Sequence, residues 1–134
     1  MAKDKTLTLV VVTPEQQVAE DTADSIVIPA HDGELGILSG RAPLMCELGI
    51  GQMRYQKGSA IRRVFIDGGF AQVHDNQVTI LTEHAAPAEE VTKEMVAEAE
   101  HALSEAGGRT IEDVEARGRV RRRLGVLRAL RGNH

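Results

Sequence analysis

Residues that could carry out chemistry are few and scattered in this 134-residue chain. The single cysteine, Cys46, has apolar neighbours and no cationic residue beside it, so we expect a small hydrophobe rather than a nucleophile. No pair of histidines has the spacing of a helical metal site, and no serine lies in a nucleophile-elbow context. A phosphate-binding glycine loop is absent as well. The sequence therefore predicts a binding protein without catalytic residues, metal or cofactor.

Charge is divided unevenly along the chain. The net charge is −4, yet residues 116–134 contain seven arginines and no acid, while residues 1–115 contain all 20 acids. Such a basic segment is typical of chains with an acidic partner, a nucleic acid or a membrane surface, or of a solvated helix face. The chain has two Phe, one Tyr and no Trp, which argues against a stacking platform for nucleic acid or sugars. It also has no membrane-length apolar run and no apolar signal segment at its start, so we expect a soluble, intracellular protein.

The first part of the chain, Thr6 to about Ala85, has the pattern of short strands separated by turns. Strands are expected at 6–12, 25–29, 36–38, 44–48, 51–56, 61–66, 69–73 and 77–81. Asp75-Asn76 is the expected turn before the last strand, and Asp67-Gly68-Gly69 is expected to be a turn or bulge with positive φ. A spacing of roughly eight to twelve residues per strand predicts a β-sandwich or small barrel.

The periodicity changes at about Pro87, which divides the chain into a β domain (1–87) and a helical region (88–134). Apolar residues then recur every three or four positions, which predicts an amphipathic helix that Gly107-Gly108 would end. Thr110 to Asp113 has the pattern of a capping box that opens a second helix. The short connection favours an antiparallel hairpin. Glycines and adjacent arginines weaken the second helix, so we expect it to need a partner surface.

One stretch carries a specific resemblance to a known family. Residues 33–44 read Gly-Glu-Leu-Gly-Ile-Leu-Ser-Gly-Arg-Ala-Pro-Leu. They resemble the signature G-E-L-G-I-x-P-G-H-A-P-L of the epsilon subunit of rotary F-type ATP synthase. The resemblance continues, in order along the chain, at Thr13-Pro14-Glu15, at 67–73 and at 77–82. It includes the β-domain and hairpin architecture, so it covers nearly the whole chain.

The resemblance implies an antiparallel β-sandwich of about ten strands that docks on the gamma subunit and the ring of c subunits. Such a subunit is a non-catalytic part of the central stalk, or rotor, and couples ring rotation driven by proton or sodium-ion flow to ATP synthesis. In many members the C-terminal hairpin inhibits ATP hydrolysis, either folded on the sandwich or extended along gamma toward the alpha and beta subunits. The resemblance places the chain on the cytoplasmic face of a bacterial inner membrane, in contact with the membrane only through the complex.

The resemblance also assigns candidate site residues. The ring-facing loop of the family falls on Glu34 and Arg41, with Arg41 at the position of the family's histidine. A carboxylate and a cation there could pair with polar loops of the ring. The charge pattern, rather than the resemblance, leads us to expect inhibitory contacts from four arginines, because the basic segment contains no acid of its own. Their partners would be Glu94, Glu98, Glu100 and Glu105 when the hairpin is folded, and acidic segments of another subunit when it extends. These arginines are Arg121, Arg122, Arg123 and Arg128.

Some members bind ATP through an I/L-D-x-x-R-A motif that falls on residues 91–96 of this chain. Here Thr92 replaces the Asp and Met95 replaces the Arg, which removes the charged groups that would recognise the ligand. We therefore expect no nucleotide site.

Two other classes of protein remain open from the residues alone. The arginines from Arg117 to Arg131 would allow weak, salt-sensitive contact with nucleic acid, although the acidic remainder of the chain opposes specific recognition. A free-standing ligand-binding β-sandwich also fits the composition.

Overall fold

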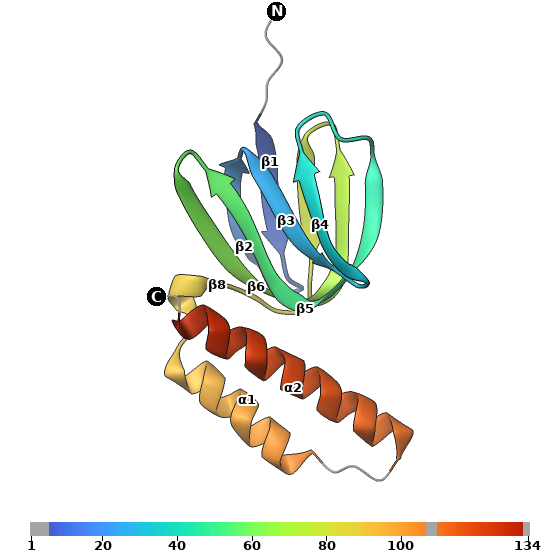
Figure 1. Ribbon diagram of the computed structural model, residues 1–134, viewed down its shortest axis with the longest axis vertical. Helices are drawn as coiled ribbons and strands as arrows, with labels where there is room; N and C mark the ends of the chain where they lie inside the picture. The colour runs from blue at the N-terminus through green and yellow to red at the C-terminus, as the bar shows by residue number, and fades with distance from the viewer. Residues whose placement is uncertain (1–5, 107–109, 133–134) are drawn as a thin grey trace, which may run out of the picture.

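Strands fill the first part of the chain and helices the last part (Figure 1). The computed structural model describes residues 6–106 and 110–132. The strands are β1 (Leu7–Val12), β2 (Gln17–Ala23), β3 (Ser25–Ala30), β4 (Gly33–Leu38), β5 (Leu44–Lys57), β6 (Ala60–His74), β7 (Gln77–Leu81) and β8 (Ala85–Pro87). A 3-10 turn, η1 (Ala88–Glu90), leads to the helices α1 (Lys93–Glu105) and α2 (Ile111–Gly132).

The strands form one folded sheet in the order β2-β1-β7-β6-β5-β3-β4, with β8 pairing to β6. Neighbouring strands are antiparallel except β1 and β7, which pair in parallel, so the sheet is mixed. The prediction of a sandwich followed by a helical hairpin is confirmed. The described residues contain eight strands rather than about ten.

Two pairs of expected strands are each one strand in the structure, and two strands that were not expected, β2 and β8, are present. The segments 44–48 and 51–56 are one continuous strand, β5, and the segments 61–66 and 69–73 are likewise one strand, β6. Their antiparallel register continues through the glycines, with Leu48 opposite Gly69 and Ile50 opposite Asp67. Gly68 and Gly69 have φ of 71° and 99°. The expected positive φ is therefore confirmed, but the strand bends there instead of ending.

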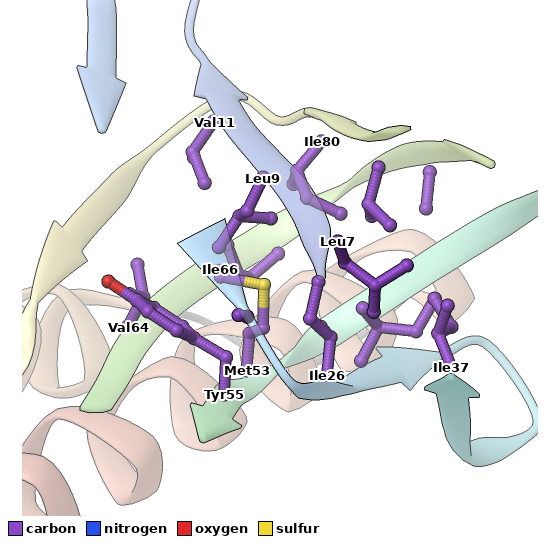
Figure 2. Packing of buried hydrophobic residues seen from close by; sticks show 14 of the residues in the cluster. Leu7, Leu9, Val11, Ile26, Ile37, Met53, Tyr55, Val64, Ile66 and Ile80 are labelled. Carbon is purple, nitrogen blue, oxygen red and sulfur yellow. The ribbon is translucent and has the colours of Figure 1, made fainter. Parts of the chain in front are cut away.

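The sandwich core is formed by alternate residues of the strands, as the period of two requires. On β1, Leu7, Leu9 and Val11 are buried while the residues between them are partly exposed. They pack in one cluster with Ile26, Met53, Ile66 and Ile80, as Figure 2 shows. Each such side chain contributes about 2 kcal/mol by leaving water, so this cluster is the main source of stability of the β region.

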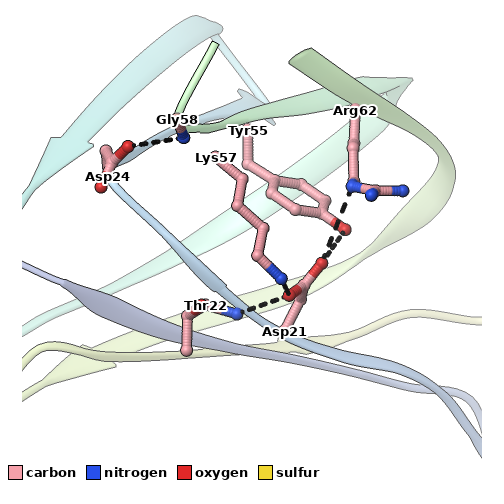
Figure 3. A network of polar contacts seen from close by, with 7 residues as sticks. All are labelled: Asp21, Thr22, Asp24, Tyr55, Lys57, Gly58 and Arg62. Atoms are coloured by element: carbon pink, nitrogen blue, oxygen red, sulfur yellow. Dashed lines mark hydrogen bonds and ion pairs between the residues drawn. The ribbon is translucent and has the colours of Figure 1, made fainter. Parts of the chain in front are cut away.

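A polar network connects edge strand β2 to the tip of the β5–β6 hairpin (Figure 3). The Asp21 carboxylate accepts hydrogen bonds from Tyr55 Oη at 3.0 Å and from Lys57 Nζ at 2.5 Å, and Arg62 Nε lies 4.0 Å away. The hydrogen bond from Lys57 lowers the pKa of Asp21. Burial and the nearby Asp21 raise the pKa of Tyr55 to about 12. The network joins strands that are far apart in the sheet order and so holds the folded sheet closed.

The two helices pack as an antiparallel pair, with α2 between α1 and the sheet (Figure 1). A second buried cluster contains Phe65 of β6 and the residues Val91, Ala99, Leu124, Leu127 and Leu130. Thr110 Oγ1 accepts the Asp113 N–H at 3.0 Å and Asp113 Oδ2 accepts the Thr110 N–H at 3.4 Å, so the predicted capping box is confirmed. The expected stop at Gly107-Gly108 lies outside the described residues. No helix among the described residues is long and apolar enough to span a membrane.

Candidate docking surfaces and the hairpin interface

An exposed apolar patch lies on the outer face of the sandwich. Phe70 of β6 and Leu81 of β7 are direct cross-strand partners, and their exposed fractions are 53% and 48%. Met45 of β5, 66% exposed, is opposite Gln72, two residues from Phe70 on the same face of β6. We call Met45, Phe70 and Leu81 the outer patch. Adjacent exposed side chains of this size are typical of an interaction surface rather than of isolated surface residues.

The two expected ring-facing residues do not share a loop. Glu34 lies in β4, near its start, and Arg41 follows the end of the same strand. The prediction that one ring-facing loop carries both residues is therefore wrong, because residues 33–38 pair with β3 along their whole length. Glu34 instead forms a two-contact ion pair with Arg54 of β5, at 2.6 and 3.2 Å, which lowers the pKa of Glu34. The side chains of both partners are solvent-accessible, and Arg41 is exposed.

The four expected inhibitory arginines of α2 fall into three environments. Arg128 pairs with Glu100 of α1 at 2.5 Å, as expected for the folded hairpin. Arg121 and Arg122 are exposed and form no ion pair within residues 6–106 and 110–132. Arg123 pairs with Asp67 of the sandwich rather than with an acid of α1. The expectation that α1 supplies the acidic partners is thus correct for Arg128 and wrong for Arg123.

Asp67 is the most buried carboxylate in the described ion pairs. Its side chain is 9% exposed, and its Oδ2 accepts hydrogen bonds from Arg123 Nε at 3.0 Å and Nη2 at 2.8 Å. His84 Nδ1 lies 3.2 Å from the same oxygen. The Asp67 N–H donates to Thr82 Oγ1 and to the His84 carbonyl, both at 3.1 Å. From the sequence we predicted only a turn or bulge at Asp67. An acid that directly follows the apolar run 64–66 could have indicated a buried carboxylate that needs a cationic partner.

The residues at the altered nucleotide motif have structural roles. Thr92 Oγ1 accepts the Met95 N–H at 3.2 Å and so caps the start of α1. Met95 packs against the hairpin core. Cys46 is half-buried against the sandwich core, and burial raises the pKa of its thiol, which fits its expected role as a small hydrophobe. In the described part of the chain no three His, Cys, Asp or Glu side chains could together hold a metal ion.

Comparison with known proteins identifies the family. Residues 6–88 match the family model of the ATP synthase delta/epsilon chain, β-sandwich domain. The ATP synthase epsilon chain of Rhodopirellula baltica is 42% identical over 127 residues, which cover 91% of this chain and 96% of the relative. That of Lawsonia intracellularis is 39% identical over 112 residues, or 84% of this chain and 82% of the relative. The chain therefore belongs to the ATP synthase delta/epsilon chain family, as its motifs predict.

Solved structures have the same fold. A chain in the cryo-EM structure of the Euglena gracilis mitochondrial ATP synthase OSCP/F1/c-ring matches with a TM-score of 0.72 at 23% identity, covering 99% of this chain and 84% of that chain. A chain in the Tetrahymena thermophila mitochondrial ATP synthase central stalk and c-ring matches with a TM-score of 0.69 at 16% identity, covering 96% and 98%. Both matches extend beyond the sandwich into the hairpin.

Proposed function

We propose that this chain is a non-catalytic central-stalk subunit of a proton-translocating F-type ATP synthase, in which it couples rotation of the c-ring to ATP synthesis. The observation that carries the proposal is the match of nearly the whole chain to a protein named ATP synthase epsilon chain. The fold supports it, since chains of the same fold occur in ATP synthase assemblies that include a c-ring. As part of that complex the chain would lie peripherally on the cytoplasmic face of the bacterial inner membrane.

The outer patch is the surface that we assign to the gamma subunit. Its three side chains come from β5, β6 and β7, which are neighbours in the middle of the sheet order and are therefore held on both sides by other strands. Apolar anchors that lose their exposure on binding supply most of the affinity of a protein interface. Glu47, opposite Phe70 on β5, adds a charge to the rim of the patch.

We assign Glu34, near the start of β4, and Arg41, beyond the end of that strand, to contacts with the c-ring. Glu34 reaches the ring together with Arg54, its partner in the sandwich, so the surface offered is an ion pair rather than a single carboxylate. Exposed charges of this kind contribute about 0.2–1 kcal/mol each and mainly fix orientation. Glu34→Gln combined with Arg41→Ala should lower ATP-driven proton pumping relative to hydrolysis.

The hairpin is the element that we assign to inhibition of ATP hydrolysis. Arg121 and Arg122 are exposed on α2 and available to acidic segments of the alpha and beta subunits when the helix extends. The alternative use of these arginines, binding of nucleic acid, is disfavoured because Arg123 and Arg128 are engaged inside the folded chain.

Binding to the purified gamma subunit tests the assignment. Phe70→Gln and Leu81→Gln should each weaken binding at least about tenfold, as expected for central interface anchors. Ile61→Gln is the matched control, because Ile61 is 55% exposed on the same strand as Phe70 but outside the outer patch. A pull-down of the intact chain from solubilised membranes should recover ATP synthase subunits. Recovery of nucleic acid, or of no ATP synthase subunit, would overturn the proposal.

A further inference from the structure

Among the described residues, one ion pair joins the hairpin to the sandwich, and its carboxylate is buried. Residues alternate along β6, so that Val64 and Ile66 enter the sandwich core while Phe65 enters the hairpin cluster. Asp67 continues the Phe65 side of the strand and is paired to α2 through Arg123. Folding of the hairpin thus covers a carboxylate as well as an aromatic ring.

The contacts of Asp67 come from two separate elements. Arg123 of α2 approaches with two nitrogens, and its side chain is 35% exposed, whereas His84, in the segment between β7 and β8, is 69% exposed. His84 belongs to the sandwich side of the interface and stays beside Asp67 whether or not the hairpin is folded, because a backbone hydrogen bond from the Asp67 N–H to the His84 carbonyl joins the two residues. Arg123 is the partner that leaves when the hairpin leaves.

A buried carboxylate that loses its cation is strongly unfavourable, whereas the same carboxylate in water is not. If Arg123 is removed, the folded hairpin covers Asp67 without its guanidinium, and the released hairpin does not. Removal of Arg123 therefore favours release of the hairpin. Removal of Asp67 leaves only a partly exposed arginine without its partner, and so has a smaller effect.

We propose that Asp67 and Arg123 form a latch that holds the hairpin on the sandwich, with His84 as a fixed neighbour of Asp67 on the sandwich side. Arg123 then stabilises the folded hairpin, whereas Arg121 and Arg122, which precede it directly on α2, are assigned to contacts of the extended hairpin. The latch is a property of the chain by itself. Its consequence for hydrolysis rests on the proposed function: loss of Arg123 strengthens inhibition, while loss of exposed arginines that contact the catalytic subunits weakens it.

Hydrogen–deuterium exchange of the purified full-length chain tests the latch. Arg123→Gln should speed exchange of the amides in 120–131 at least about tenfold, and Asp67→Asn should speed it less. Arg123→Lys keeps the charge but loses the two-nitrogen approach, so its exchange should lie between wild type and Arg123→Gln. Arg122→Gln is the matched control and should remain within about twofold of wild type. Unchanged exchange in β1 and β7 shows that the sandwich is intact.

The double variant Asp67→Asn/Arg123→Gln separates the pair from two independent effects. The latch predicts exchange no faster than in Arg123→Gln alone, because the uncompensated carboxylate is gone. The latch is overturned if Arg123→Gln behaves like Arg122→Gln, or if the effects of the two single changes multiply in the double variant. These outcomes do not involve other subunits. A latch confirmed in the free chain, together with no binding to gamma, would overturn the proposed function alone.

Discussion

Single positions in this chain differ widely in how much backbone freedom they require. Gly69 has a φ of 99°, and a Cβ added there would lie 1.9 Å from the Leu81 carbonyl oxygen. Gly58 also has positive φ, 62°, but a Cβ there would meet no atom within 4 Å. The two glycines therefore separate steric overlap from backbone strain.

Gly69→Ala should lower the free energy of unfolding by about 3 kcal/mol or more, because strain and a backbone clash add together. Gly58→Ala carries the strain only and should cost about 1 kcal/mol. Urea unfolding followed by circular dichroism measures both. Equal losses in the two variants would contradict the close approach of β6 to β7 at Gly69.

The Asp21 network predicts a pH dependence of stability. The pKa of Asp21 is lowered by its hydrogen bond from Lys57, so its contribution is present above the ordinary value of 3.8 and is lost as pH falls toward the depressed value. Asp21→Asn should thus reduce stability by about 1 kcal/mol at pH 7, and wild type and variant should converge at a pH below the depressed pKa of Asp21. Urea unfolding at both pH values measures the difference. Glu20→Gln, on the same strand but exposed, is the control; an equal pH effect there would exclude the network as the cause.

At the scale of elements, the sequence predicts the type of each region better than its boundaries. The breaks in alternation at Gly49-Ile50-Gly51 and Asp67-Gly68-Gly69 resemble strand ends, because bends and turns both use glycine. Only the register of the neighbouring strand shows that pairing continues through them. β2 was not predicted because an edge strand with an exposed face has a polar composition and a weak periodic signal.

At the hairpin interface, too, local features could be predicted from the sequence and tertiary contacts could not. The capping box at Thr110 is local and could be predicted, whereas Arg123 and Asp67 are 56 residues apart and meet only through packing of α2 on β6. Charge counting along the chain correctly located a basic segment in need of acidic partners. It could not distinguish an acid of α1 from an acid of the sandwich.

The division into β region and hairpin predicts that residues 1–87 fold alone and still bind gamma. The sandwich cluster contains no residue of α1 or α2, so its burial survives truncation. The hairpin's removal uncovers Phe65 and Asp67, which belong to the interface rather than to that core. Circular dichroism and gamma-binding of a chain ending at Pro87 test this. An unfolded or non-binding fragment would show that the hairpin completes the β domain.

At the scale of the whole molecule, different surfaces have different proposed tasks. The outer patch of β5, β6 and β7 is assigned to gamma, the Glu34–Arg54 pair of β4 and β5 to the c-ring, and the exposed arginines of α2 to the catalytic subunits. The proposed function assigns the transmission of torque to rigid docking of the sandwich, and assigns a change of partner to the hairpin. Coupling and inhibition should therefore be separable by truncation.

ATP-driven proton pumping and ATP hydrolysis, measured together in membranes reconstituted with the assembled complex, test this account most directly. Three preparations are compared: the complex with the intact chain, with a chain ending at Pro87, and without the chain. The account predicts that the truncated chain supports pumping and raises hydrolysis, and that the complex without the chain hydrolyses ATP but does not pump. Equal pumping with and without the chain would contradict its role in the rotor.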